Sequence, residues 1–118
     1  SNTTYQAKLY TADTLTNGDT AYMASNAVYG DWLYAMQVFA DELSGASTLT
    51  GLLQWSNDNT NWTTDPTADT LSLTDDGSTW WEGKCYGKYL RVRVIQTGTA
   101  TAEVDGALVL KKPIVKNQ

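Results

Sequence analysis

The stretch YLRVRVIQ, residues 89–96, alternates apolar and charged side chains and decides the fold class. Leu90, Val92 and Val94 fall on one face of an extended chain, and the two arginines between them fall on the other. Branched residues such as valine favour strands because they pack well on a pleated surface. The pattern predicts a strand over 88–97 with one face in a core and one face towards solvent.

A second alternating run, TAEVDGALVL (residues 101–110), follows after a short polar segment. Two such runs joined by a short turn are typical of an antiparallel β-hairpin. We therefore expect the two runs to pair in one sheet, with one of the two arginines near Glu103 or Asp105. An exposed ion pair of this kind contributes about 0.2–1 kcal/mol, so it would set the register more than the stability.

The run WLYAMQVFA, residues 32–40, is largely apolar on both faces of an extended chain. We interpret it as a central strand, with one face against the opposite sheet and the other covered by a loop or a neighbour. Nine residues without Gly or Pro also suit a helix, which is the competing interpretation. As a strand, one face carries Trp32, Tyr34, Met36 and Val38, and the other carries Leu33, Ala35, Gln37 and Phe39.

Turn-forming residues recur at short intervals between these runs, as at Asn17-Gly18 and at Asp75-Asp76-Gly77. Seven or eight short strands between such turns are typical of two packed sheets. We predict an all-β fold, an antiparallel β-sandwich of the jelly-roll or Ig-like kind. The expected strands are 5–11, 19–24, 31–41, 47–56, 69–74, 79–85, 88–97 and 101–111.

The length of 118 residues suits one compact domain. We place it at 13–112, preceded by an N-terminal arm or first strand at 1–12 and followed by a tail at 113–118. The sequence contains no His and a single Cys, so it lacks the usual general base, the usual zinc ligand and an internal disulfide. We therefore expect no catalytic residue, no metal ligand and no cofactor.

Residues 57–61 and Cys85 are the two places in the sequence that resemble chemical sites. Residues 57–61, NDNTN, place oxygen-bearing side chains like the start of a calcium loop, but the Gly and Glu that complete an EF-hand are missing. Asn and Asp are also what a tight turn selects, and we favour the turn. Cys85 follows Lys84, which can lower a thiol pKa, but without a His partner we interpret it as a structural thiol.

Charge divides the chain unevenly. Residues 1–82 carry eleven acids and one Lys, whereas residues 83–118 carry seven basic residues and two acids, which makes balances of −10 and +5 within a net charge of −5. An acidic chain without a dense basic face does not suit nucleic acid. No apolar run is long enough to span a membrane, and no basic-then-apolar leader opens the chain.

Four tryptophans lie close to polar turns: Trp55, Trp62, Trp80 and Trp81. Exposed rings on a β-sandwich can stack on sugars, so these residues are a candidate carbohydrate platform. The structural alternative is that Trp62 and one of Trp80 or Trp81 fill the ends of the core. Adjacent residues of a strand point to opposite faces, so only one ring of the pair 80–81 is expected in the core.

Residues 53–64, LQWSNDNTNWTT, resemble the "SNDGxNW" turn of small β-sandwich virion proteins of tailed bacteriophages. Residues 86–94, YGKYLRVRV, are similar to the "YGKYVRVRV" strand that follows in that family, and residues 97–111 match its last hairpin. The resemblance covers about residues 47–112. Asn59 stands where the family more often has Gly, and Asn also suits a left-handed turn position.

The resemblance implies a phage structural protein, foremost a capsid decoration (cement) protein on the capsid surface, made in the host cytoplasm. Its implied partners are the major capsid protein or other virion proteins, with no nucleic acid and no membrane. A head-fibre, head–tail or tail role is the neighbouring alternative within the virion. Small interfaces on such a lattice become strong by multivalency.

We expect both ends of the chain to contact capsid subunits, because Lys residues gather where the strand pattern ends and Pro113 stops the last strand. Self-association through an exposed aromatic face is a second expectation. The alternative from another class is a carbohydrate-binding module or receptor-binding tip that uses the tryptophans. The residues expected at the capsid contact are Tyr5, Lys8, Lys111, Lys112, Pro113, Ile114 and Lys116.

Overall fold

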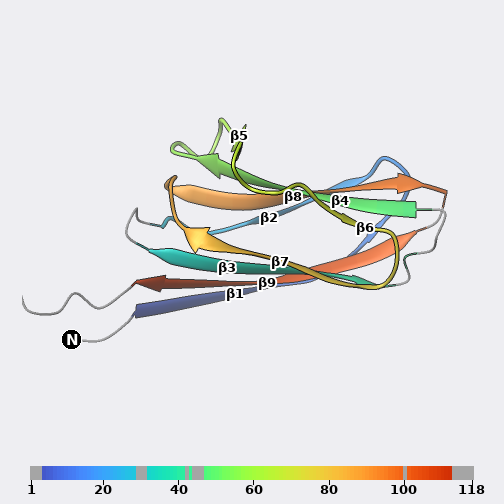
Figure 1. Ribbon diagram of the computed structural model, residues 1–118, viewed down its shortest axis with the longest axis horizontal. Helices are drawn as coiled ribbons and strands as arrows, with labels where there is room; N and C mark the ends of the chain where they lie inside the picture. Colours follow the sequence, from blue (N-terminus) through green and yellow to red (C-terminus); the bar gives the residue numbers. More distant parts are fainter. Residues whose placement is uncertain (1–3, 29–31, 42, 44–46, 100, 113–118) are drawn as a thin grey trace, which may run out of the picture.

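The computed structural model describes residues 4–28, 32–41, 43, 47–99 and 101–112. Within these ranges the chain forms nine β-strands and no helix, so the predicted all-β sandwich is confirmed (Figure 1). The strands are β1 (Thr4–Leu15), β2 (Thr20–Ala24), β3 (Leu33–Asp41), β4 (Ser47–Ser56), β5 (Thr63–Thr64), β6 (Leu71–Leu73), β7 (Gly77–Lys84), β8 (Tyr89–Gly98) and β9 (Ala102–Lys112).

The strands form two antiparallel sheets that pack face to face (Figure 1). The first sheet has the order β1-β9-β3-β7, and the second has the order β2-β8-β4-β5, with β6 also paired to β4. The chain passes from one sheet to the other at every connection except those between β4, β5 and β6. This winding is that of a jelly roll, which decides between the two sandwich types expected from the sequence. No helix that could cross a membrane occurs in the described part of the chain.

The expected hairpin between β8 and β9 is wrong. Strand β8 lies between β2 and β4, whereas β9 lies between β1 and β3 in the other sheet. Each strand has an inward apolar row, and the jelly roll buries the two inward rows against each other across the core rather than side by side. Their charged rows therefore face opposite sides of the molecule, and Arg91 and Arg93 lie on the other outer surface from Glu103 and Asp105.

Most strand positions agree with the expected ranges within a few residues. Strand β4 coincides with the predicted 47–56, and β1 is longer than predicted because it continues to Leu15 beyond an irregularity between Tyr10 and Asp13. Strand β5 was not expected, since two residues are too few to show an alternation. The first strand occupies residues 4–15, and the tail expected at 113–118 lies outside the described residues.

The core lies between the inner faces of the two sheets. Leu90, Val92 and Val94 of β8 are buried, as the alternation predicts. They belong to one cluster with Met36 of β3 and Leu108 of β9, which face them from the first sheet. The interpretation of residues 32–40 as a central strand is also confirmed, since β3 pairs with both β7 and β9.

Glycine at an inward position allows a close approach between the sheets. A Cβ on Gly51 of β4 would lie 2.7 Å from Cη2 of Trp81, whose indole nitrogen donates a 3.0 Å hydrogen bond to the carbonyl of Asp69. The ring therefore has little freedom to move away. Gly51 and Trp81 form a small-to-large pair that fills this part of the core.

We predict that Gly51→Ala destabilises the protein by about 1–3 kcal/mol, because a methyl group overpacks against a fixed ring. Urea unfolding followed by tryptophan fluorescence measures the effect. The matched control is Gly83→Ala in β7, where the new Cβ would lie at an ordinary 3.4 Å from Tyr34. We expect that variant to be as stable as the wild type or up to about 1 kcal/mol more stable. Equal stability of the two variants would contradict the packing argument.

Candidate functional site

The described residues contain no cluster of three or more acidic or cysteine side chains that could hold a metal ion. Cys85 is buried, and burial raises the pKa of its thiol to about 11, which keeps it protonated. A buried, protonated thiol is unreactive, which is consistent with the interpretation of Cys85 as a structural residue. Two candidate functional surfaces are described below: the outer face of the β1-β9-β3-β7 sheet and a cleft beside β7.

The segment 57–61 is a turn built around a carboxylate. Oδ1 of Asp58 accepts hydrogen bonds from the backbone N–H groups of Thr60 (2.9 Å) and Asn61 (2.8 Å), and Oδ2 accepts one from the Asn61 side chain at 2.7 Å. These bonds, led by the backbone N–H of Asn61, hold the pKa of Asp58 well below its usual range. Asn59 has a φ of 60°, the left-handed conformation expected for it. The carboxylate is occupied by its own turn, which favours the turn over a calcium loop.

The outer face of the β1-β9-β3-β7 sheet, called the outer face below, is apolar. Leu9 is 81% exposed and Trp80 is 51% exposed, and three further large apolar side chains on this face are between 37% and 41% exposed. The register brings Leu9, Ala107, Gln37 and Trp80 into one row across the four strands. Exposed apolar side chains gathered on one face of a sheet mark an interaction surface. The three further residues are Leu33, Phe39 and Val109.

Sequence reasoning found only part of this face. The run 32–40 predicts two apolar faces on β3, and Leu33 and Phe39 confirm that its second face is not covered by a loop of the described chain. Leu9 and Val109 were missed. A signal existed for Val109, because Ala107 and Val109 make the last strand apolar on both faces. Leu9 stands between polar neighbours, so its exposure could not be read from the sequence.

The four tryptophans do not form one platform. Trp81 is in the core and Trp80 is on the outer face, as adjacency in a strand predicts. Trp55 fills one end of the core, where its ring meets Tyr34 edge-on at 5.6 Å and its Nε1 donates a 2.9 Å hydrogen bond to Asp65.

Trp62 does not fill an end of the core, which corrects the structural alternative drawn from the sequence. It lies on the outer side of the second sheet, where the guanidinium of Arg91 is stacked between the rings of Trp62 and Tyr22, 4.3 Å from each ring centre. Nε of Arg91 also donates a 2.6 Å hydrogen bond to Oε1 of Gln54. The stack uses Trp62 to hold a charged side chain flat on the sheet.

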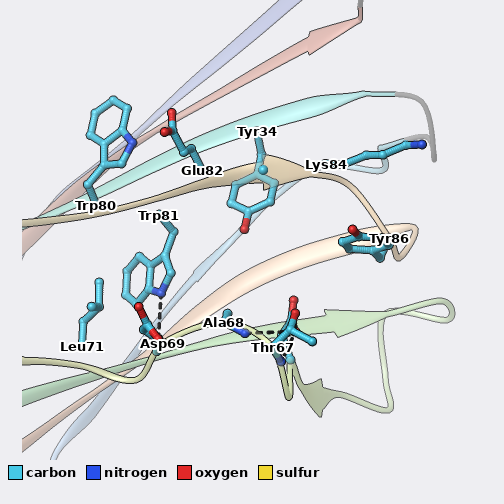
Figure 2. A pocket seen from close by; sticks show the side chains of 12 residues that line it. Tyr34, Thr67, Ala68, Asp69, Leu71, Trp80, Trp81, Glu82, Lys84 and Tyr86 are labelled. Atoms are coloured by element: carbon cyan, nitrogen blue, oxygen red, sulfur yellow. Dashed lines mark hydrogen bonds between the residues drawn. The ribbon is translucent and has the colours of Figure 1, made fainter.

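A cleft of about 440 Å³ opens at the edge of the sandwich, between β7 and the segment 65–71 (Figure 2). Position 83 of β7 faces inward but is a glycine, so no side chain fills this edge and Tyr34 is reached from outside. Tyr34 points into the cleft beside Trp81, with Tyr86 at the far side (Figure 2). A second hollow of about 350 Å³ adjoins it, and both are lined by Asp65, Thr67 and Tyr86.

The Tyr34 hydroxyl is the polar group at the floor of the cleft. Burial, and after it the negative charge of Asp65, raises the pKa of this phenol to about 12, so it stays neutral. Within the described residues it has no hydrogen-bond partner. Carboxylates and a cation line the rim, so the cleft offers both donors and acceptors beside aromatic rings. The charged lining residues are Asp65, Asp69, Glu82 and Lys84.

The residues expected at a capsid contact fall into three groups. Lys8 is held within the fold, since its Nζ donates a 2.8 Å hydrogen bond to the carbonyl of Ala24. Lys111 and Lys112 are exposed at the end of β9, beside the start of β1. The remaining expectations, Pro113, Ile114 and Lys116, lie outside the described residues, as does the side chain of Tyr5. Their role at a capsid stays a prediction.

Comparison with known proteins finds solved structures with a similar fold but assigns the chain to no family. No protein-family model matches the sequence, and no curated protein sequence matches it. Among solved structures, the PBSX exported protein XepA is similar with a TM-score of 0.70 and 15% identity, over 96% of this chain and 39% of that chain. The VP2 subviral particle of infectious bursal disease virus is similar with a TM-score of 0.62 and 10% identity, over 92% of this chain and 32% of that chain.

A Clostridium thermocellum xylanase, in a structure of its CBM22-1 and GH10 modules, is similar with a TM-score of 0.54 and 13% identity. That match covers 98% of this chain and 27% of the xylanase chain. The chain thus spans well under half the length of each of these three proteins. At these identities the likeness shows a shared β-sandwich fold and nothing further about activity.

The turn around Asp58 gives a pH-dependent prediction. The pKa of Asp58 is lower in the folded protein than the value near 3.9 of an unfolded chain, so its contribution to stability is present above about pH 4 and is lost as the pH falls through the folded pKa. We expect Asp58→Ala to lower the urea midpoint at pH 7. The difference from the wild type should stay constant between pH 5 and 8 and shrink from pH 4 to pH 2.

Asp13→Ala is the control, because Asp13 is an exposed carboxylate on β1. Its urea midpoint should differ little from that of the wild type across the whole pH range. A difference for Asp58→Ala that persists unchanged at pH 2 would contradict the role given to the charged carboxylate.

Proposed function

We propose that this protein is a non-enzymatic virion structural protein of a tailed bacteriophage, a capsid decoration protein that binds the major capsid protein lattice and stabilises the head. The observation that carries the proposal is the apolar outer face. Leu9 and Trp80 are more than half exposed on a four-stranded sheet. Burying such side chains against another protein yields about 25 cal/mol per Å² of apolar area, so the fold is built to associate.

Two further observations support a virion setting. The turn at 53–64 and the strand at 86–94 resemble those of small virion proteins of tailed phages. The fold is also that of the VP2 subviral particle, whose sandwich is similar over 92% of this chain. The described residues offer no thiolate and no metal cluster for catalysis, which favours binding over chemistry.

Immunogold electron microscopy tests the proposal. Virions are purified from the phage that carries the gene and labelled with antibody against the purified chain. We expect many gold particles on each head, because a decoration protein follows the capsid lattice. Antibody adsorbed with purified chain is the control. Label confined to tails would overturn the decoration role, and virions without label from a lysate that contains the chain would overturn the virion role.

Carbohydrate binding is the second candidate function, and the cleft between β7 and the segment 65–71 favours it. A neutral phenol at its floor, aromatic rings beside it and carboxylates at its rim suit the hydroxyl groups and apolar faces of a sugar. The xylanase structure that shares the fold was solved with xylohexaose. In this chain the site would be centred on Tyr34 and Tyr86, with Trp80 and Trp81 also lining the cleft, rather than on all four tryptophans.

A microarray of neutral oligosaccharides tests this second function. We expect Gly83→Val to abolish binding by filling the cleft, and Tyr34→Phe to weaken it at least tenfold by removing the hydroxyl. Leu9→Ser on the outer face is the control and should bind as the wild type does. A blank array, or binding that survives Gly83→Val, would reject the cleft as a sugar site.

A further inference from the structure

The centre of the outer face is a row of uncharged side chains that crosses all four strands. The row consists of Leu9 on β1, Ala107 on β9, Gln37 on β3 and Trp80 on β7. Leu9 and Trp80 at its two ends are more exposed than any other large apolar side chain of the outer face. The row therefore presents an apolar strip about as wide as the sheet.

Charge of opposite sign stands at the two ends of this face. Lys111 of β9 and Lys84 of β7 both pair with Leu33, which places them in one basic row. At the other end Glu103 of β9 pairs with Asp41 of β3 in an acidic row. Strand β9 thus runs from a basic end, through the apolar row, to an acidic end, and Glu82 of β7 is an acidic side chain on the basic half of the face.

The two ends are placed symmetrically about the apolar row. On β9, Lys111 and Glu103 each lie four residues from Ala107, one on each side. Four residues of extended chain span about 13 Å. A two-fold axis along the apolar row would therefore bring the basic end of one copy over the acidic end of another.

We propose that the occupant of the outer face is a second copy of this chain, packed face to face about that two-fold axis. In this arrangement Trp80 meets Trp80 and Leu9 meets Leu9, while Lys111 of each copy faces Glu103 of the other. An axis along the strands would instead place the basic end of one copy over the basic end of the other. Stacked sheets are commonly rotated by about 30°, which keeps each charged end near its opposite. The inference rests on the proposed function, which takes the outer face as an association surface, and it names a second copy rather than a capsid subunit as the protein packed on that face.

The area of the outer face sets the expected affinity of the dimer. Eight residue steps along four strands cover roughly 26 Å by 19 Å, about 500 Å² of flat area. This is less than the roughly 800 Å² per partner of a standard stable interface. We therefore expect a dissociation constant in the micromolar range, which many copies on one lattice would strengthen by multivalency.

Sedimentation equilibrium of the purified chain between 5 and 500 µM tests the proposal. We expect a monomer–dimer equilibrium for the wild type. Trp80→Ser combined with Leu9→Ser should weaken dimerisation at least tenfold. Tyr86→Ser removes a comparably exposed ring at the end of the sandwich and should leave the dimer unchanged.

Charge exchange tests the two-fold geometry itself. Lys111→Glu alone places Glu opposite Glu103, and Glu103→Lys alone places Lys opposite Lys111, so each variant should dimerise at least threefold more weakly. An equimolar mixture of the two variants should recover dimers as a heterodimer, and the double variant should recover them by itself. Lys111 is exposed and Glu103 is half-buried on the outer face, and neither belongs to the core, so the variants are expected to fold.

A chain that stays monomeric up to 500 µM overturns the proposal. So does a dimer that is indifferent to Trp80→Ser with Leu9→Ser, or single charge variants that do not recover on mixing. These outcomes are separate from the test of the proposed function, because gold label on virion heads does not depend on dimerisation in solution. Labelled heads with a monomeric chain would leave the decoration role standing and assign the outer face to another occupant.

Discussion

The burial of two alternating apolar rows against each other is the constraint on which this structure depends. Strand β8 and strand β9 supply these rows from opposite sheets, and Val92 and Val104 in their middles are fully buried. Because side chains of a strand alternate, each inward residue fixes the direction of its neighbours. The core thereby decides what the two outer surfaces display: an arginine stacked between aromatic rings on one, and an apolar face on the other.

Inward side chains fill the core, but Gly51 and Gly83 are inward positions without a side chain, and they have opposite results. At Gly51 the missing side chain admits the ring of Trp81, and the core is filled. At Gly83 nothing from the opposite sheet takes the space, and the edge of the sandwich opens into the cleft at Tyr34. The same residue type thus gives close packing where a large partner faces it and a hollow where none does.

The candidate site follows from how surface chemistry is distributed over the fold. Carboxylates such as Asp58 are occupied in turns, and the one thiol is buried with a raised pKa. What the surface offers instead is apolar area on one sheet with charges of opposite sign at its ends. Such a surface suits association, which agrees with the structural role proposed for this protein.

The sequence by itself determined the all-β class, the strand positions and the inward rows, because hydrophobic alternation is a local property that each strand carries alone. It also predicted that Trp80 and Trp81 point to opposite faces. It could not determine which strands pair, and the hairpin expected between β8 and β9 was wrong for that reason. Pairing depends on which apolar rows fit each other across the core, and only the tertiary structure decides that. The apolar outer face and the Tyr34 cleft exist only after this choice, since both are formed by residues that pairing brings together from distant parts of the chain.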